Sequence, residues 1–170
     1  MLKAVGSMLL LSGCLWMGML KVKQMDKRIK MLQSMLCALE IMEREMSFCM
    51  PLLEDMLILA ARSTEGAIRD FLSLCSCELK NDSGVPFSEI WDRAAREHLT
   101  ALIENDLEHV LMLGSILGRY DSDGQQHALH KAHIALQQTF LNAVSDRKSQ
   151  GKLYKTLSAT LGVFLVILFL

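Results

Sequence analysis

Two uncharged apolar runs occupy the ends of this 170-residue chain. The first extends from Ala4 to Leu20 and the second from Thr156 to Leu170. As helices they would be roughly 26 Å and 23 Å long, slightly short of a hydrocarbon core of about 30 Å. Interfacial Trp16 and Tyr154 and the lysines beside the runs can close that gap. We therefore predict transmembrane helices at residues 1–20 and 156–170.

Basic residues gather at the inner edge of both runs. They are Lys21, Lys23, Lys27, Arg28 and Lys30 after the first run, and Arg147, Lys148, Lys152 and Lys155 before the second. Lysine and arginine flanking membrane helices are retained on the cytoplasmic side. This bias predicts that residues 21–155 form a cytoplasmic domain and that both termini lie outside the cell.

One alternative concerns the N-terminal run. Leu11-Ser12-Gly13-Cys14 looks like a lipoprotein cleavage site, in which Cys14 would become the acylated first residue. The apolar run continues beyond Cys14 to Leu20, however, and a basic cluster that would resist export follows it. These two features favour a transmembrane helix.

The composition of the middle segment favours helices and gives no nucleic-acid signature. Half of the chain is hydrophobic, with twelve methionines and only two prolines, and the net charge is −1. The basic residues cluster at the predicted membrane edges and not over a broad face, as a nucleic-acid-binding surface would require. A domain of this length can bury a real core.

Apolar residues recur at steps of three and four through the middle of the chain, which is typical of amphipathic helices. The first stripe consists of Val22, Met25, Ile29, Leu32, Leu36, Leu39, Met42 and Met46. It continues the N-terminal run without a break and should end near Phe48, because Pro51 disfavours helical geometry before it. Further helices are predicted over 51–62, from after Gly66 to 79, from 87 or 88 to about 95, from 99 or 106 to 117, and from 122 toward 150. The expected fold is all-α, a cytoplasmic bundle of about six helices flanked by N- and C-terminal transmembrane helices.

No catalytic or metal-binding motif is present in the sequence. Phosphate-loop, nucleophile-elbow and HExxH patterns are all missing. His127, His130 and His133 are spaced so that neighbours share a helix face, but an exposed polar face explains them better than a metal site. The acidic stretches Glu40–Glu45 and Glu104–Glu108 are interpreted as solvated faces, and the five cysteines as buried free thiols. We expect no cofactor, and a protein that acts through contacts and not as an enzyme.

Several short motifs occur in an order that resembles the stage III sporulation protein AB family of endospore-forming bacteria. They are Glu45-Met46-Ser47-Phe48 leading to Pro51-Leu52, Trp91, Leu113-Gly114, Leu117-Gly118-Arg119 with Asp121 and Gln125, and Lys152-Leu153-Tyr154 before the apolar tail. The chain departs from the family pattern at Phe48, Tyr120 and Ser158, where tyrosine, serine and glycine respectively are usual. The motif residues Glu45, Pro51, Trp91, Gly114, Gly118, Asp121 and Gln125 are expected to be structural. Gly118 should end a helix, and Gly114 should permit close approach to a neighbour.

The resemblance implies a function that periodicity alone cannot give. Family members belong to a channel between mother cell and forespore, and their helical domain resembles the cytoplasmic domain of the type II secretion F platform protein. The implied protein is a membrane platform or adaptor subunit in the mother-cell membrane. Its implied partners are the bilayer, other stage III sporulation channel subunits and the operon's secretion-type ATPase, but no nucleic acid or small-molecule substrate. The alternative is a membrane-tied interaction protein unrelated to sporulation.

Overall fold

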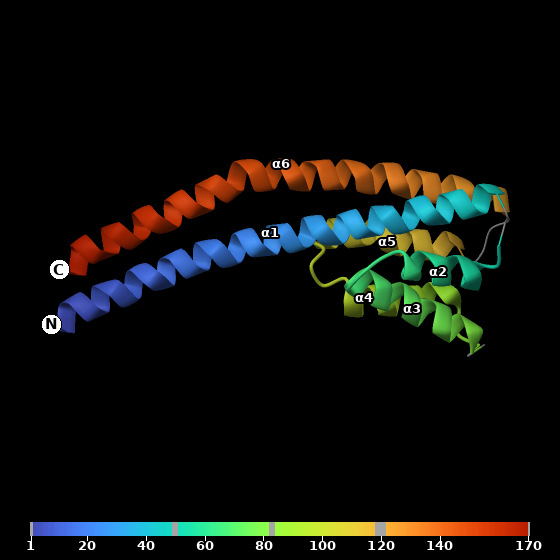
Figure 1. Cartoon of the computed structure of the whole chain (residues 1–170), viewed down its shortest axis with the longest axis horizontal. Coiled ribbons are helices and arrows are strands. Elements are labelled where there is room, and N and C mark those ends of the chain that lie inside the picture. Colours follow the sequence, from blue (N-terminus) through green and yellow to red (C-terminus); the bar gives the residue numbers. More distant parts are fainter. Residues whose placement is uncertain (1, 49–50, 82–83, 118–121, 170) are drawn as a thin grey trace. The chain divides into compact units, whose positions relative to one another are not determined.

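The computed structural model describes residues 2–48, 51–81, 84–117 and 122–169. This part of the chain consists of α-helices and the irregular segments that join them, and it contains no strands. Six helices follow one another along the chain (Figure 1). They are α1 (Leu2–Phe48), α2 (Leu53–Arg62), α3 (Ala67–Lys80), α4 (Phe87–His98), α5 (Glu104–Leu117) and α6 (Ser122–Phe169). The predicted all-α bundle of six helices is confirmed.

The chain divides into two compact units. The terminal unit comprises Met1–Ile29 and Asn142–Leu170, and the central unit comprises Lys30–Leu141. Both α1 and α6 contribute to each unit, because each is a single uninterrupted helix. The continuity expected between the first apolar run and the stripe that follows it is thus confirmed. The division into membrane segments 1–20 and 156–170 around a cytoplasmic segment 21–155 stays a prediction.

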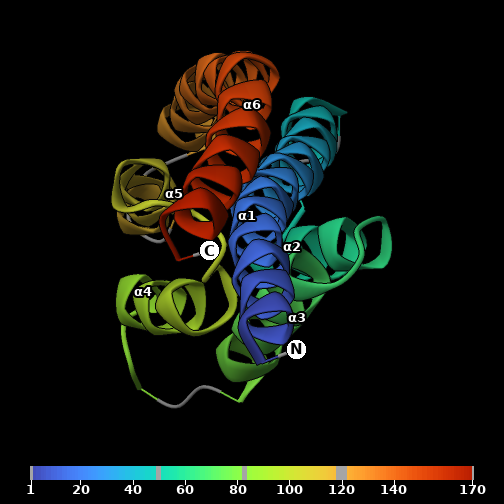
Figure 2. The same ribbon diagram turned by 90° about the vertical axis from the view of Figure 1, so that its left-hand side faces the viewer.

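In the terminal unit, the first part of α1 and the last part of α6 lie side by side and antiparallel (Figures 1 and 2). Asp26 and Arg147 join them: Nε of Arg147 donates to Oδ1 at 2.8 Å, and Nη2 donates to Oδ2 at 3.4 Å. Large apolar side chains are exposed on both helices of this unit, namely Trp16, Met17, Met19, Leu20, Val144, Leu153, Leu157 and Phe164. The two segments are therefore held together by a bidentate ion pair and leave much apolar surface uncovered.

The predicted transmembrane helices are not found in the described part of the chain, where no helix has an apolar stretch sufficient to cross a membrane. The uncharged runs, Ala4–Leu20 and Thr156–Leu170, are 17 and 15 residues long, and spanning helices usually have about 20 apolar residues. Both helices pass from these runs directly into charged sequence.

The core of the central unit surrounds Trp91, which is fully buried on α4. Phe71 of α3 meets its ring edge-on, with ring centroids 4.6 Å apart, and Phe87 lies at 5.6 Å. Helices α2 to α5 pack in chain order, α2 on α3, α3 on α4 and α4 on α5. Phe87 belongs to α4 itself, so the contact with Phe71 is the one that joins Trp91 to α3 in this core.

Two helix starts differ from the sequence-based prediction. Helix α2 begins at Leu53 and not at Pro51, because Leu52 has the extended backbone of an N-cap and its carbonyl oxygen accepts a hydrogen bond from the amide of Met56.

Helix α5 begins at Glu104, between the two predicted starts at 99 and 106. The carboxylate of fully buried Asp106 accepts the amide of Ile103 at 3.4 Å, which satisfies a free donor at that helix end.

Candidate interaction groove between α1 and α6

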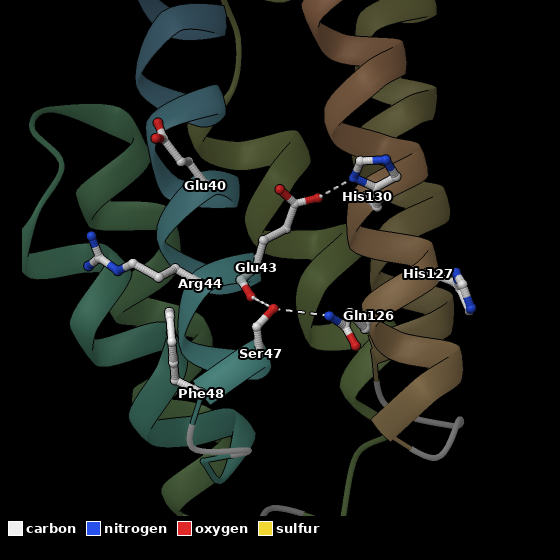
Figure 3. Close-up of a pocket in the computed structure, with 8 residues that line it drawn as sticks. All are labelled: Glu40, Glu43, Arg44, Ser47, Phe48, Gln126, His127 and His130. Atoms are coloured by element: carbon white, nitrogen blue, oxygen red, sulfur yellow. Dashed lines mark hydrogen bonds and ion pairs between the residues drawn. The ribbon is translucent and has the colours of Figure 1, made fainter.

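A groove of about 620 Å³ opens in the central unit, where the last turns of α1 run beside the first turns of α6 (Figure 3). Its lining, called here the α1–α6 groove, is formed by Glu40, Glu43, Arg44, Ser47, Phe48, Gln126, His127 and His130. Nearly all of these side chains are polar or charged. A groove of this composition suits contact with another macromolecule better than an apolar ligand.

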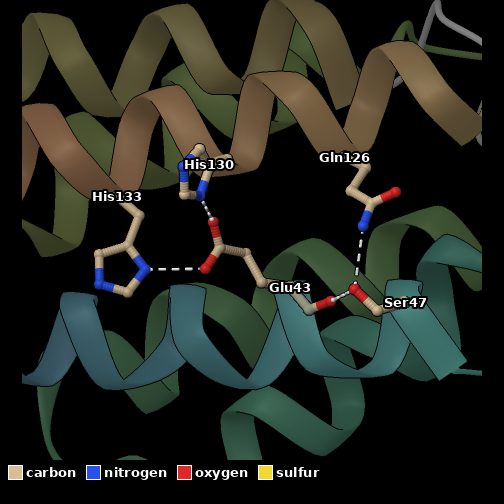
Figure 4. A network of polar contacts seen from close by, with 5 residues as sticks. All are labelled: Glu43, Ser47, Gln126, His130 and His133. Carbon is tan, nitrogen blue, oxygen red and sulfur yellow. Dashed lines mark hydrogen bonds and ion pairs between the residues drawn. The ribbon is translucent and has the colours of Figure 1, made fainter.

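A polar network crosses the groove from α1 to α6 (Figure 4). Glu43 lies at its centre: its Oε1 is 3.2 Å from Nδ1 of His130, and its Oε2 is 2.9 Å from Nδ1 of His133. One turn further along, the amide nitrogen of Gln126 donates to the hydroxyl oxygen of Ser47 at 2.9 Å. That hydroxyl donates in turn to the backbone carbonyl of Glu43 at 2.9 Å. Three side-chain contacts therefore fix the register between the two helices.

The chemistry of this network follows from the carboxylate. Because an ionised carboxylate only accepts hydrogen bonds, both histidines must present a protonated Nδ1 to Glu43. The His133 side chain is 25% exposed and the His130 side chain 68%. No group of histidine, cysteine and carboxylate side chains within the described ranges is arranged to hold a metal ion. The arrangement is a helix-to-helix clamp.

The outer rim of the groove is exposed. Figure 3 shows Glu40, Arg44 and Phe48 directed away from the clamp. Phe48 is 81% exposed, and nearby in the chain Leu52 is 75% exposed. Arg44 pairs with neighbouring Glu45 at 3.5 Å, whereas Glu40 has no cation within ion-pair distance among the residues that the structure describes. Phenylalanine is one of the residues enriched in protein contact surfaces, so exposed Phe48 makes this rim a candidate contact surface.

Two of the seven motif residues contact each other in the core. A Cβ built on Gly114 of α5 would lie 2.1 Å from Cδ1 and 2.4 Å from Cγ of Trp91. The indole nitrogen of Trp91 donates to the carbonyl of Val110 at 2.7 Å, which holds the ring against α5. Gly114 is therefore the close-approach position for α4.

Among the other motif residues, Glu45, Pro51 and Gln125 lie apart from this contact and from the lining of the groove. Gln125 donates from its amide to the carbonyl of Leu117 at 2.9 Å, and so binds the end of α5. Glu45 lies on α1 next to Arg44, and Pro51 lies in the connection to α2. Gly118 and Asp121, including the helix end expected at Gly118, fall outside the described residues.

The clamp formed by Glu43, His130 and His133 is not predicted from the sequence. Glu43 lies in a stretch predicted to be a solvated acidic face, and the histidines in one predicted to be an exposed polar face. His127 and His130 are exposed, but His133 is half-buried and paired. No local signal identifies this pair, because Glu43 and His133 are 90 positions apart.

The cysteines in the described part are free thiols, as predicted, but the expected burial holds for Cys75 alone among them, because Cys37 and Cys77 are exposed. Cys75 is buried and Cys77 exposed, as expected for two positions on different sides of a helix. Burial, with a smaller contribution from Glu78, raises the pKa of the Cys75 thiol to about 12. This thiol therefore stays protonated and unreactive near neutral pH.

Comparisons with known proteins agree with the sequence motifs. A comparison with curated protein sequences finds no match. A solved structure of stage III sporulation protein AB is similar in fold, with a TM-score of 0.65 and 18% sequence identity over 72% of this chain and 98% of that chain. The sequence matches the stage III sporulation protein AB family over residues 3–170. The chain belongs to the stage III sporulation protein AB family.

Proposed function

We propose that this protein is a membrane platform or adaptor subunit of the mother cell–forespore channel complex, and that it presents its central unit to a secretion-type ATPase. The observation that carries the proposal is family membership over nearly the whole chain, which supports a role in sporulation. Membership also favours this function over the alternative of an interaction protein unrelated to sporulation. On this proposal the protein acts by binding and not as an enzyme.

The α1–α6 groove is the surface that best suits such a partner. Aromatic side chains, including phenylalanine, are enriched at protein interfaces, and Phe48 is the most exposed large apolar side chain among the described residues of the central unit. Glu40 on the same rim favours a partner with a basic residue. The Glu43 clamp holds the rim in place, which reduces the entropy lost on binding.

Attachment to the mother-cell membrane is part of the proposal. It is supported by the uncharged runs Ala4–Leu20 and Thr156–Leu170, by the basic residues beside them and by the exposed apolar side chains of the terminal unit. On this proposal residues 21–155 are cytoplasmic. A maleimide that cannot cross membranes should then leave exposed Cys37 and Cys77 unlabelled in intact cells and label both after lysis. Labelling in intact cells would overturn this orientation.

The partner is tested by photo-crosslinking in sporulating cells. A photoreactive amino acid at position 48 should give an adduct with the ATPase, whereas the same amino acid at Ile134 should not. Ile134 is a suitable control because it is an exposed apolar residue of α6 that does not line the groove.

A genetic test uses the same two positions. In a host whose native gene is deleted, Phe48→Glu should lower the yield of heat-resistant spores strongly, and Ile134→Glu should leave it near the wild-type level. Both variant proteins should accumulate normally, because neither side chain is buried. Normal spore yield with Phe48→Glu, or equal crosslinking from both positions, would refute the groove as the partner surface.

A further inference from the structure

A second groove of the central unit lies between α2 and α3. Its volume is about 410 Å³, and it is lined by Ile58, Ala61, Arg62, Arg69, Ser73 and Ser76. No carboxylate contributes to the lining. The groove therefore combines two guanidinium groups and two hydroxyl groups over a small apolar floor.

The fold holds one of the two arginines in position. Nε of Arg69 donates to the carbonyl of Thr64 at 2.8 Å. Thr64 is itself buried, and its hydroxyl donates to the carbonyl of Ala60 at 3.0 Å, so the loop before α3 is anchored to the end of α2. The turn is completed by Gly66, whose φ of 60° is unfavourable for other residues. Only Nε is used in this contact, which leaves the terminal nitrogens of Arg69 available to a ligand.

These arginines differ from others in the described residues. Arg44, Arg93, Arg96 and Arg147 each pair with a carboxylate. Neither Arg62 nor Arg69 has a carboxylate within ion-pair distance in the described ranges, although Glu65 and Asp70 are close in sequence. Two uncompensated cations that share a groove repel each other unless an anion lies between them.

We infer that the α2–α3 groove binds a phosphate group, with Arg62 and Arg69 as its cationic ligands and Ser73 as a hydroxyl donor. The planar, forked guanidinium group matches the tetrahedral oxygens of phosphate, and Arg69 is already oriented. Ser73 and Arg69 lie four residues apart on α3, so both reach the same ligand. A free phosphate monoester and the phosphodiester headgroup of an anionic lipid share this chemistry.

The experiment measures phosphate binding to the full chain in an uncharged detergent by calorimetric titration. Two water-soluble probes distinguish the sources: inorganic phosphate stands for a free phosphate, and glycerophosphoglycerol for the headgroup of phosphatidylglycerol. Arg62→Gln should weaken binding of the preferred probe about tenfold or more, as expected for a lost charge-assisted contact. Arg96→Gln is the matched control, because it removes the same charge from an exposed arginine of α4 that pairs with Glu104.

The outcomes separate clearly. Saturable binding of either probe that Arg62→Gln weakens and Arg96→Gln does not supports the proposal, and the tighter probe identifies the source. Arg62→Lys, which keeps the charge but loses the fork, should fall between wild type and Arg62→Gln. Absence of saturable binding by both probes, or an equal loss with Arg96→Gln, would overturn it. The side chain of Arg62 is exposed and makes no hydrogen bond or ion pair with the described residues, so its replacement should leave the midpoint of thermal unfolding unchanged.

Discussion

Replacing Gly114 with alanine perturbs the contact between α4 and α5 by a single methyl group. That carbon would lie within 2.9 Å of three atoms of the Trp91 side chain, all of them closer than real Cβ contacts allow. Either α4 must move away from α5, or the indole must rotate and break its hydrogen bond to Val110. Trp91 has little room to rotate, because it also contacts the rings of Phe71 and Phe87.

The expected cost follows from these contacts. Overpacking in a core costs about 1–3 kcal/mol, and a lost hydrogen bond from a buried donor about 1–3 kcal/mol. Alanine recovers about 1 kcal/mol through its better helix propensity. We therefore expect Gly114→Ala to lower the free energy of unfolding by about 3 kcal/mol.

The assay is a urea titration of the full chain in mild detergent, followed by the fluorescence of Trp91. Trp16→Phe in the background makes Trp91 the sole tryptophan, since the chain has two. Ser115→Ala, at the next position of α5, is exposed and should change stability by less than about 0.5 kcal/mol. If Gly114→Ala behaved like Ser115→Ala, the close approach of α4 and α5 would be refuted.

Four further predictions concern other residues. Gln125→Ala should lower the free energy of unfolding by about 1 kcal/mol in the same titration, because it frees the carbonyl of Leu117 at the end of α5. At pH 8 a maleimide should label Cys37 and Cys77 but not buried Cys75, as read by mass spectrometry. The pKa of Cys75 is about 12 in the folded protein, against an ordinary value of 9.0, so between these values the unfolded chain loses the thiol proton and the folded protein keeps it. The free energy of unfolding should therefore fall as pH rises from 9 to 12 in wild type, and fall less in Cys75→Ala. An equal fall in both proteins would contradict this. A double-mutant cycle of Asp26→Ala and Arg147→Ala should give a coupling of about 0.5–1 kcal/mol that weakens in high salt, and no coupling would contradict the ion pair.

Local rules predicted most of the helices from the sequence. Pro51 and the Lys80–Pro86 loop are strong signals that interrupt helices. The predicted positions of three helix boundaries therefore agree with the structure within about a residue: the ends of α1 and α3 and the start of α4. The stripe on α1 was predicted less completely. Leu32, Leu39, Met42 and Met46 are buried, but so are Met35, Ala38 and Ile41. A single stripe describes a helix packed on one side, whereas this part of α1 buries a wider arc.

The register between α1 and α6 could not be predicted from the sequence. Periodicity shows which face of a helix is apolar, but it does not show which residue of α6 lies opposite Glu43. The clamp therefore looked like two solvated polar faces. Gly114 was identified as a close-approach position, yet its neighbour Trp91 belongs to another helix and could be found only in three dimensions.

The order in which helices of the central unit find their partners has a consequence for synthesis on the ribosome. Helices α2 to α5 pack on their neighbours in the chain, so each gains a partner soon after it is made. The face of α1 that carries Glu43 and Ser47 must wait for residues 79 to 90 positions later. Contacts between distant residues form late in folding, because closing a long loop costs entropy before any contact forms. The nascent chain thus passes through a stage in which α1 lacks α6, and this stage ends only when residues 126–133 of α6 reach Glu43 and Ser47.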